Sequence, residues 1–331
     1  MLAFPAFWAN GYGLTQIGSA DLPLGSMVST FNGLAWFWFV GLYVKHTWRL
    51  PERPAPVSRW DGGIALMLLA SCGAVGLVAT VLTGASNPFL QQLFLHLFLD
   101  LFAVGWFTLA LLGVVWAWLG AQTGLPHQLP GTWLAVALAS TFILGMSPAV
   151  VTPGLFWPAA VANLVAAALL SIHCYQLWRR RAYLGPLGIL GLGALAVMIL
   201  AAVIIVIPGV WSFGGSGQLR IFYLHDLLLG WVSTLLVIVI ERRFAPAAKN
   251  SRRAVELLWG VGVVGMLLAL LGLGVAPFIG ISALFWLQLA AWCSVAVAAA
   301  TLVLFGVVLA QLLRTPRQQQ AILLPGSINP R

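Results

Sequence analysis

RIFYLHDLLLGWVSTLLVIVIERR, residues 220–243, decides the fold class of this chain. It is an apolar run of transmembrane length, since about 20 apolar residues span the hydrocarbon core of a bilayer. His225 and Asp226 lie close to its start. Ionisable side chains inside such a helix cost about 2.5–3.5 kcal/mol each on insertion scales, and they usually face a bundle interior, a cavity or a bound ligand. Both residues are therefore candidates for function.

A second stretch, LFLHLFLDLFAVGWFTLALLG at residues 93–113, is similar. It has the same Gly-Trp pair as the first stretch and places His96 and Asp100 just before that pair. Trp106 and Trp231 belong to these pairs and lie deeper than the tryptophans near helix ends, so we expect them to flank any flat cofactor. Two histidine-bearing helices of similar sequence suggest that both contact one bound group.

Composition indicates an integral membrane protein. Hydrophobic residues make up 61% of the chain and charged residues only 7%, whereas soluble domains carry about 25% charged residues. The net charge of +9 comes from short basic clusters between apolar runs, which is typical of topology signals and argues against nucleic-acid binding. The three cysteines fall inside apolar runs without metal-ligand or disulfide spacing.

The sequence predicts an all-α membrane protein with about nine transmembrane helices. If the N-terminus lies outside, Arg220 is the one basic residue on the outer side and the other fifteen of the sixteen Lys and Arg residues lie inside. The positive-inside rule therefore favours an N-outside, C-inside topology, in what we expect to be a bacterial inner (plasma) membrane. The apolar segments are residues 24–47, 62–85, 88–120, 131–152, 155–178, 186–211, 219–241, 254–276 and 281–313.

Similar residues recur at an offset of about 125 to 131 positions, which indicates a parallel four-helix repeat. Asn32 and Asn163 hold corresponding places near the outer ends of the first and fifth helices. The predicted organisation is an outer interfacial segment, two four-helix units, a ninth helix and a flexible cytoplasmic tail, at residues 1–22, 23–152, 153–278, 279–314 and 315–331.

Depth separates His96 and His225 from the other histidines. At about 1.5 Å per residue, both lie on the order of 10 Å below the outer surface. One interpretation is that both ligate a haem through neutral imidazole nitrogens. The other is a pair of imidazoles that hydrogen-bond neighbouring helices, which stabilises helix association by about 0.6 kcal/mol on average.

Helices that enter from outside with a histidine near the start, four helices apart, resemble the haem-bearing helices of the haem–copper oxidase catalytic subunit. LHDLLLGW, residues 224–231, also resembles a segment of NnrS-like membrane proteins, with Tyr223 where a further histidine would stand. The resemblance covers only these two helices and the four-helix periodicity. It implies a b-type haem near the outer face, with His96 and His225 corresponding to the histidines of those helices.

The chain departs from that family in its ligand count. Only two histidines lie at this depth, so copper would be under-liganded and the chain is not a complete oxygen reductase. Electron transfer or the handling of oxygen or nitric oxide is the function that the resemblance implies, with a redox partner at the outer face or other membrane subunits as partners. Alternatives are a transporter or permease, and a structural subunit of a membrane complex; the sequence does not establish whether the protein is an enzyme.

Four polar residues are candidates for proton sites or for hydrogen bonds to the histidines. Asp100 lies on the face of His96 one turn deeper, as residues i and i+4 do, and is either an acceptor for the imidazole or a protonated carboxyl bonded to another helix. Asp226 points away from His225, toward the headgroups or Arg220. Asn32 and Asn163 either line the same outer cavity or hold helices together.

Overall fold

The computed structural model describes residues 15–17, 20–22, 24–84, 86–123, 131–214, 217–244 and 249–313. The chain divides into two compact units, Met1–Arg53 and Pro54–Arg331. The predicted repeat boundary near residue 152 does not coincide with this division. The predicted tail, residues 315–331, lies outside the described residues.

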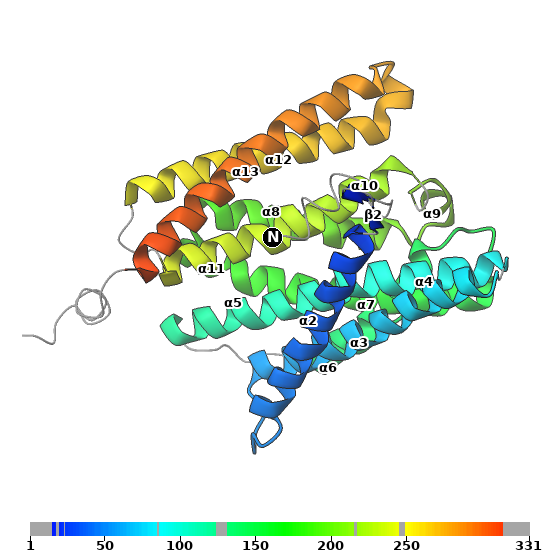
Figure 1. Ribbon diagram of the computed structural model, residues 1–331, viewed down its shortest axis with the longest axis horizontal. Coiled ribbons are helices and arrows are strands. Elements are labelled where there is room, and N and C mark those ends of the chain that lie inside the picture. The colour runs from blue at the N-terminus through cyan, green and yellow to red at the C-terminus, as the bar shows by residue number, and fades with distance from the viewer. Residues whose placement is uncertain are drawn as a thin grey trace, which may run out of the picture. The chain divides into compact units, whose positions relative to one another are not determined.

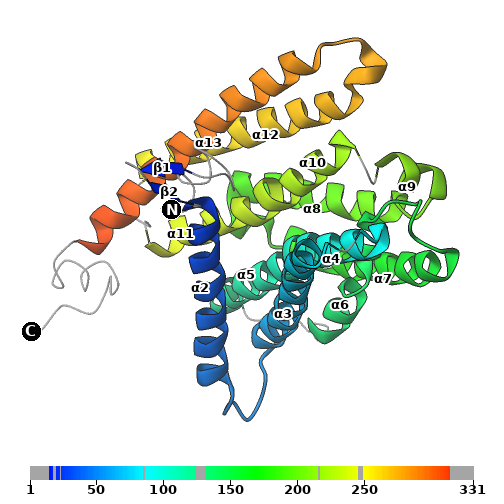
Figure 2. The ribbon, with the colours of Figure 1, turned by 45° about the vertical axis from the view of Figure 1, so that its right-hand side comes forward.

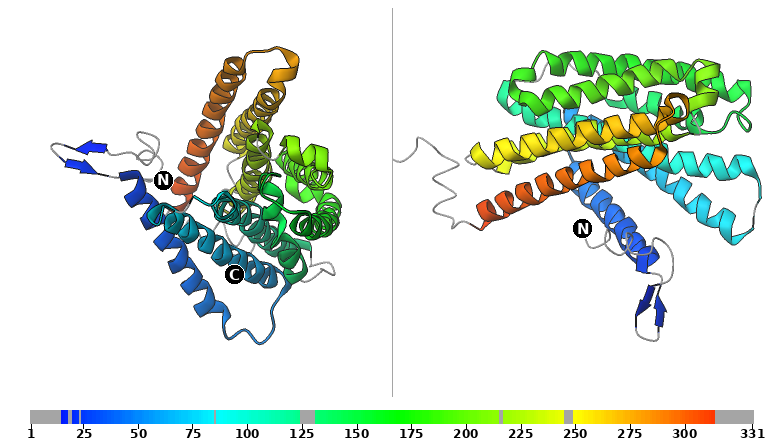
Figure 3. Two further views of the ribbon diagram at one scale, coloured as in Figure 1. Left: turned by 90° about the vertical axis from the view of Figure 1, so that its right-hand side faces the viewer. Right: turned by 90° about the horizontal axis from the view of Figure 1, so that it is seen from above.

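The first unit contains a small hairpin and one helix. β1 (Thr15–Ile17) and β2 (Ala20–Leu22) pair antiparallel, and the 24-residue helix α2 (Leu24–Thr47) comes after them (Figure 3). Both strands lie within residues 1–22, the predicted outer interfacial segment. β1 carries Thr and Ile, whose branched side chains favour extended backbone.

The second unit is a bundle of helices (Figure 1). Two of its segments, η1 and η3, are wider π-helical turns, and η2 is a 3₁₀-helix. The elements are α3 (Ala55–Leu82), α4 (Pro88–Asp100), η1 (Leu101–Phe107), α5 (Thr108–Thr123), α6 (Gly131–Leu138), η2 (Thr141–Gly145), α7 (Pro153–Trp178), α8 (Arg181–Ile204), α9 (Pro208–Gly214), α10 (Gln218–His225), η3 (Asp226–Ser233), α11 (Thr234–Phe244), α12 (Lys249–Ile279) and α13 (Ala283–Leu312).

Within the described residues, seven helical segments are long and apolar enough to cross a membrane. They confirm the prediction of a helical membrane protein. The predicted fourth span does not form one long helix, because α6 ends at Leu138 and the 3₁₀-helix η2 ends at Gly145. The seven segments are Ala55–Thr80, Pro88–Thr123, Pro153–Trp178, Arg181–Ile204, Leu219–Phe244, Ser251–Phe278 and Ala283–Leu312.

The last two helices form a hairpin, visible in yellow and orange in Figure 2. Gly280, with φ of +68°, comes directly after the end of α12 and makes the short turn that Pro277 and Gly280 predict. Glycine adopts this left-handed backbone without steric cost. In the most apolar stretch of α13 only 11% of the residues are buried within the chain. Most of the surface of this helix is therefore available to lipid.

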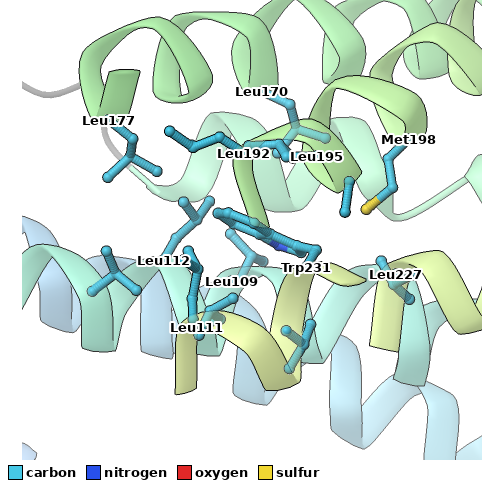
Figure 4. Packing of buried hydrophobic residues seen from close by; sticks show 14 of the residues in the cluster. Leu109, Leu111, Leu112, Leu170, Leu177, Leu192, Leu195, Met198, Leu227 and Trp231 are labelled. Atoms are coloured by element: carbon cyan, nitrogen blue, oxygen red, sulfur yellow. The ribbon is translucent and has the colours of Figure 1, made fainter. Parts of the chain in front are cut away.

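The core of the second unit is built around Trp231 of η3. Its side chain is fully buried and lies among leucines of the surrounding helices (Figure 4). Large hydrophobic side chains such as Trp133, which is 65% exposed, cover the outside instead. This distribution suits a bundle whose surroundings are as apolar as its interior.

Both π-helical segments contain the Gly-Trp pair seen in the sequence, and each begins directly after a candidate site residue. η1 comes after Asp100, and η3 comes after His225. Thr234 closes η3: its hydroxyl donates to the carbonyl of Leu229, five residues back, at 2.7 Å, and accepts from Nε1 of Trp259 at 2.9 Å. Single π turns occur often at functional sites.

Candidate functional site

His96, Asp100 and Arg220 form a largely buried ion cluster between α4 and α10. Nη2 of Arg220 lies 2.6 Å from Oδ1 of Asp100 and 2.8 Å from Nδ1 of His96. Nδ1 of His96 lies 3.1 Å from Oδ2 of Asp100. The side chains of His96 and Asp100 are each 10% exposed and that of Arg220 is 19% exposed, so this is not a solvated surface pair.

Local sequence explains how α4 presents its two members of the cluster. The side chain of Asn87 accepts hydrogen bonds from the backbone N–H groups of Phe89 and Leu90, and Pro88 occupies the first helical turn, where a missing N–H costs nothing. The helix therefore starts at a defined residue. His96 and Asp100 then lie one turn apart on one face, which confirms the predicted contact between them.

Gly145, at the end of η2, closes the cluster from a third side. Its carbonyl accepts a hydrogen bond of 2.9 Å from Nη1 of Arg220. A Cβ atom at this position would collide with Oδ2 of Asp100 and would come within 2.7 Å of Nδ1 of His96 and 2.8 Å of Nη1 of Arg220. A larger residue at this position would therefore push the side chains of the cluster away from the backbone.

Nδ1 of His96 lies within hydrogen-bond distance of both Asp100 and Arg220, but it can form only one of these two hydrogen bonds at a time. A ring nitrogen of a neutral histidine either donates or accepts a hydrogen bond. Nδ1 of His96 cannot at the same time donate to Asp100 and accept from Arg220. The tautomer of the imidazole decides which of the two contacts is a hydrogen bond.

A cavity of about 280 Å³ lies beside the cluster. Asp100 and Arg220 line it together with Asn163, Thr141 and Tyr223, and most of the other lining side chains are apolar. Its volume is just below the range of about 300–1,000 Å³ that is typical of ligand pockets. A mostly apolar pocket with a few convergent polar groups is suited to a small molecule with one polar end.

Asn163 fulfils both roles that the sequence suggests for it. Its side chain lines the cavity, and its Nδ2 donates to the carbonyl of Ala202 on α8 at 2.6 Å. The side chain of Asn32 lies outside the described residues.

Among the described residues, no hydrogen bond or ion pair joins His225 or Asp226 to the cluster. Nδ1 of His225 donates to the carbonyl of Ile221 on its own helix at 2.8 Å. Asp226 is only 2% exposed and its Oδ2 has no hydrogen-bond partner among the described residues. We expected Asp226 near the headgroups or paired with Arg220; the carboxylate that pairs with Arg220 in the structure is that of Asp100.

The two tryptophans expected to flank a cofactor both pack against neighbouring helices. Trp231 is surrounded by leucines in the core, and the ring of Trp106 lies against α3, where it is 3.0 Å from a Cβ atom built at Gly63. Neither tryptophan, and neither His96 nor His225, is among the described residues that line the cavity.

Haem and copper require separate consideration. The described residues contain no group of three or more His, Cys, Asp or Glu side chains placed to hold a metal ion. Nδ1 of His96 and Nδ1 of His225 each lie beside an oxygen atom of their own helix, so Nε2 is the nitrogen of each ring that would hold a haem iron.

Arg220 and Gly145 are the residues that sequence reasoning missed. Arg220 is the one basic residue on the predicted outer side, and that isolation was the available signal. An unclustered arginine at the end of an apolar helix needs an anionic partner, and Asp100 is the carboxylate that another apolar run supplies at a similar depth. Gly145 gave no signal, because many glycines occur in apolar helices.

A scan against protein-family models found none that matches, and searches of curated proteins and of solved structures found no similar chain.

Proposed function

We propose that this protein is a permease-type integral membrane protein that binds a small apolar carboxylic acid together with a proton. The observation that carries the proposal is the buried cluster of His96, Asp100 and Arg220 on the wall of the cavity. Ionisable groups within a membrane bundle commonly mark substrate or proton pathways.

The charges of the cluster suggest the mechanism. With Asp100 ionised, its carboxylate occupies Arg220 at 2.6 Å. Uptake of one proton by the Asp100–His96 pair weakens that ion pair and frees the guanidinium for the carboxylate of a solute, because arginine binds carboxylates through a matching pair of N–H donors. The apolar lining holds the rest of the solute. Solute anion and proton enter together, so the net charge inside the bundle is unchanged.

The accompanying topology belongs to the same proposal. It is the N-outside, C-inside arrangement in a plasma membrane, with two parallel four-helix units. Two features support the repeat: both Gly-Trp pairs lie in π-helical segments, and each segment starts directly after an ionisable residue. A site near the interface of two repeats is usual in transporters.

Binding of radiolabelled benzoate to purified protein in detergent tests the function. We expect wild type to take up one proton per benzoate in weakly buffered solution. Arg220→Gln should abolish binding. Asp100→Asn should bind benzoate without proton uptake and with little dependence on pH, because Arg220 then has no competing carboxylate. Arg253→Gln, at an exposed position on α12, is the matched control. Benzoate binding by Arg220→Gln at the wild-type level would contradict the proposal.

Haem binding by His96 and His225 is our second proposal. One observation favours it: Nδ1 of each ring lies beside an oxygen of its own helix, as in many metal-ligating histidines whose other nitrogen, Nε2, binds the metal. When bound, the haem would supply one-electron or gas-binding chemistry. An absorption spectrum of the solubilised protein tests this proposal: a Soret band that His96→Ala and His225→Ala both remove supports it, and an iron-free, colourless preparation rejects it.

A further inference from the structure

Three consecutive arginines, Arg179–Arg181, form the turn between α7 and α8, and each lies over an aromatic ring. The guanidinium carbon of Arg179 is 6.0 Å from the ring centre of Tyr175, that of Arg180 is 5.4 Å from Trp116, and that of Arg181 is 4.9 Å from Trp178. Cation–π contacts operate at such distances. The stacking holds three positive charges in one turn of the chain.

These charges have no carboxylate partner in the described part of the chain. Their hydrogen bonds go to neutral acceptors at 3.2–3.4 Å: the Tyr175 hydroxyl, the Thr123 hydroxyl, and the carbonyls of Gln176 and Trp178. Neutral acceptors at these lengths leave most of the donor capacity of three guanidinium groups unused. The turn is therefore well suited to bind an anion.

An open apolar groove of about 500 Å³ begins at the same two rings. Tyr175 and Trp178 line it from α7, with Ser171 deeper on the same helix, and Ile189, Gly193 and Ala196 line it from α8. Nothing lies within 4 Å of a Cβ atom built at Gly193, so the groove is unfilled at this point. Both helices are candidate membrane spans, which places the groove at the depth of lipid chains.

We propose that the arginine turn and the groove bind one anionic phospholipid, with its phosphate on Arg179–Arg181 and an acyl chain along α7 and α8. On α8 the lining runs from Ile189 to Ile199, about 15 Å of helix, or about one leaflet of the hydrocarbon core. Basic pockets between spans on the cytoplasmic side commonly hold anionic headgroups. A soluble anion would leave the groove empty, and an uncharged lipid would leave the three cations unpaired.

Native mass spectrometry of the full chain in neutral detergent, titrated with phosphatidylglycerol or phosphatidylcholine, tests the proposal. Wild type should bind one phosphatidylglycerol per chain about tenfold or more tightly than phosphatidylcholine, because each arginine near an anionic headgroup contributes about 1 kcal/mol. The preference should disappear in Arg179→Gln/Arg181→Gln, which changes the two exposed arginines and keeps Arg180 on Trp116. Gly193→Leu should weaken both lipids by filling the groove while keeping every charge.

Arg253→Gln on α12 is the control for removal of an exposed positive charge, and it should bind both lipids as wild type does. Equal affinity of wild type for the two lipids would overturn the proposal. So would full phosphatidylglycerol binding by Gly193→Leu, or complete displacement of the lipid by millimolar inorganic phosphate, which would indicate a free-anion site. Thermal melting of each variant identifies any that has not folded. If the double variant has not folded, the single variant Arg181→Gln, which changes one exposed side chain, replaces it.

Discussion

Asp100→Ala tests whether the ion cluster is a coupled unit. Removal of one partner of a buried ion pair costs about 3–5 kcal/mol, because the other charge stays buried without compensation. Arg220 would keep its hydrogen bond of 2.9 Å to the carbonyl of Gly145 and its contact of 2.8 Å with Nδ1 of His96. We therefore expect a loss at the lower end of that range, about 3 kcal/mol. Arg220→Ala should cost a similar amount, since Asp100 would then be the unpaired charge.

The double variant Asp100→Ala/Arg220→Ala removes both charges and leaves neither unpaired. Its loss should be smaller than the sum of the single losses by about 1–3 kcal/mol, the range found for residues in one ion-pair network. Equilibrium unfolding in mixed micelles of increasing SDS fraction, followed by tryptophan fluorescence, measures all three. Arg253→Ala, at an exposed site, should stay within about 0.5 kcal/mol of wild type. Additive single losses would refute the coupling that we infer from the distances.

Two further substitutions test the close packing of the site and the core. Gly145→Ala should weaken benzoate binding and lower the melting temperature, because the added Cβ collides with Asp100. Gly306→Ala is the control: nothing lies within 4 Å of a Cβ atom there, so this change should be neutral or slightly stabilising. Trp231→Ala should lower the free energy of unfolding by about 3–5 kcal/mol, because the side chain of Trp231 is fully buried. Trp133→Ala, on the surface, should cost far less. Equal losses would contradict the assigned core.

The sequence predicts the parts of this structure that depend on local spacing. Apolar runs of about 20 residues correspond to helices because length and composition alone determine whether a segment can span a membrane. The contact between His96 and Asp100 was predictable for the same reason, since residues four apart share a helix face. The break in the fourth segment was not, because η2 ends at Gly145, whose carbonyl meets an arginine 75 positions later in the chain.

The orientation of helices about their own axes is the part that spacing does not determine. Counting residues places His96 and His225 at a similar depth, but depth does not say which neighbour each ring faces. In the structure His96 faces Arg220, and His225 bonds to the backbone of its own helix. The π-helical segments add to this difficulty. η1 and η3 rotate α5 and α11 relative to the continuation of an unbroken α-helix, and the Gly-Trp pair that both segments contain does not by itself predict a π-helix.

The arrangement of the cluster relates to the proposed repeat in a way that bears on transport. His96, Asp100 and Gly145 come from the first predicted four-helix unit, residues 23–152, whereas Arg220 and Asn163 come from the second, residues 153–278. If the two units exist as proposed, the ion pair and the cavity lie where they meet. An arginine that is paired across such an interface in one protonation state and released in the other would couple proton uptake to movement of one unit against the other. Rocking of repeats about a central site is the motion that alternating access requires. Asp100→Asn should thus loosen this interface as well as change benzoate binding, because both depend on the same guanidinium group.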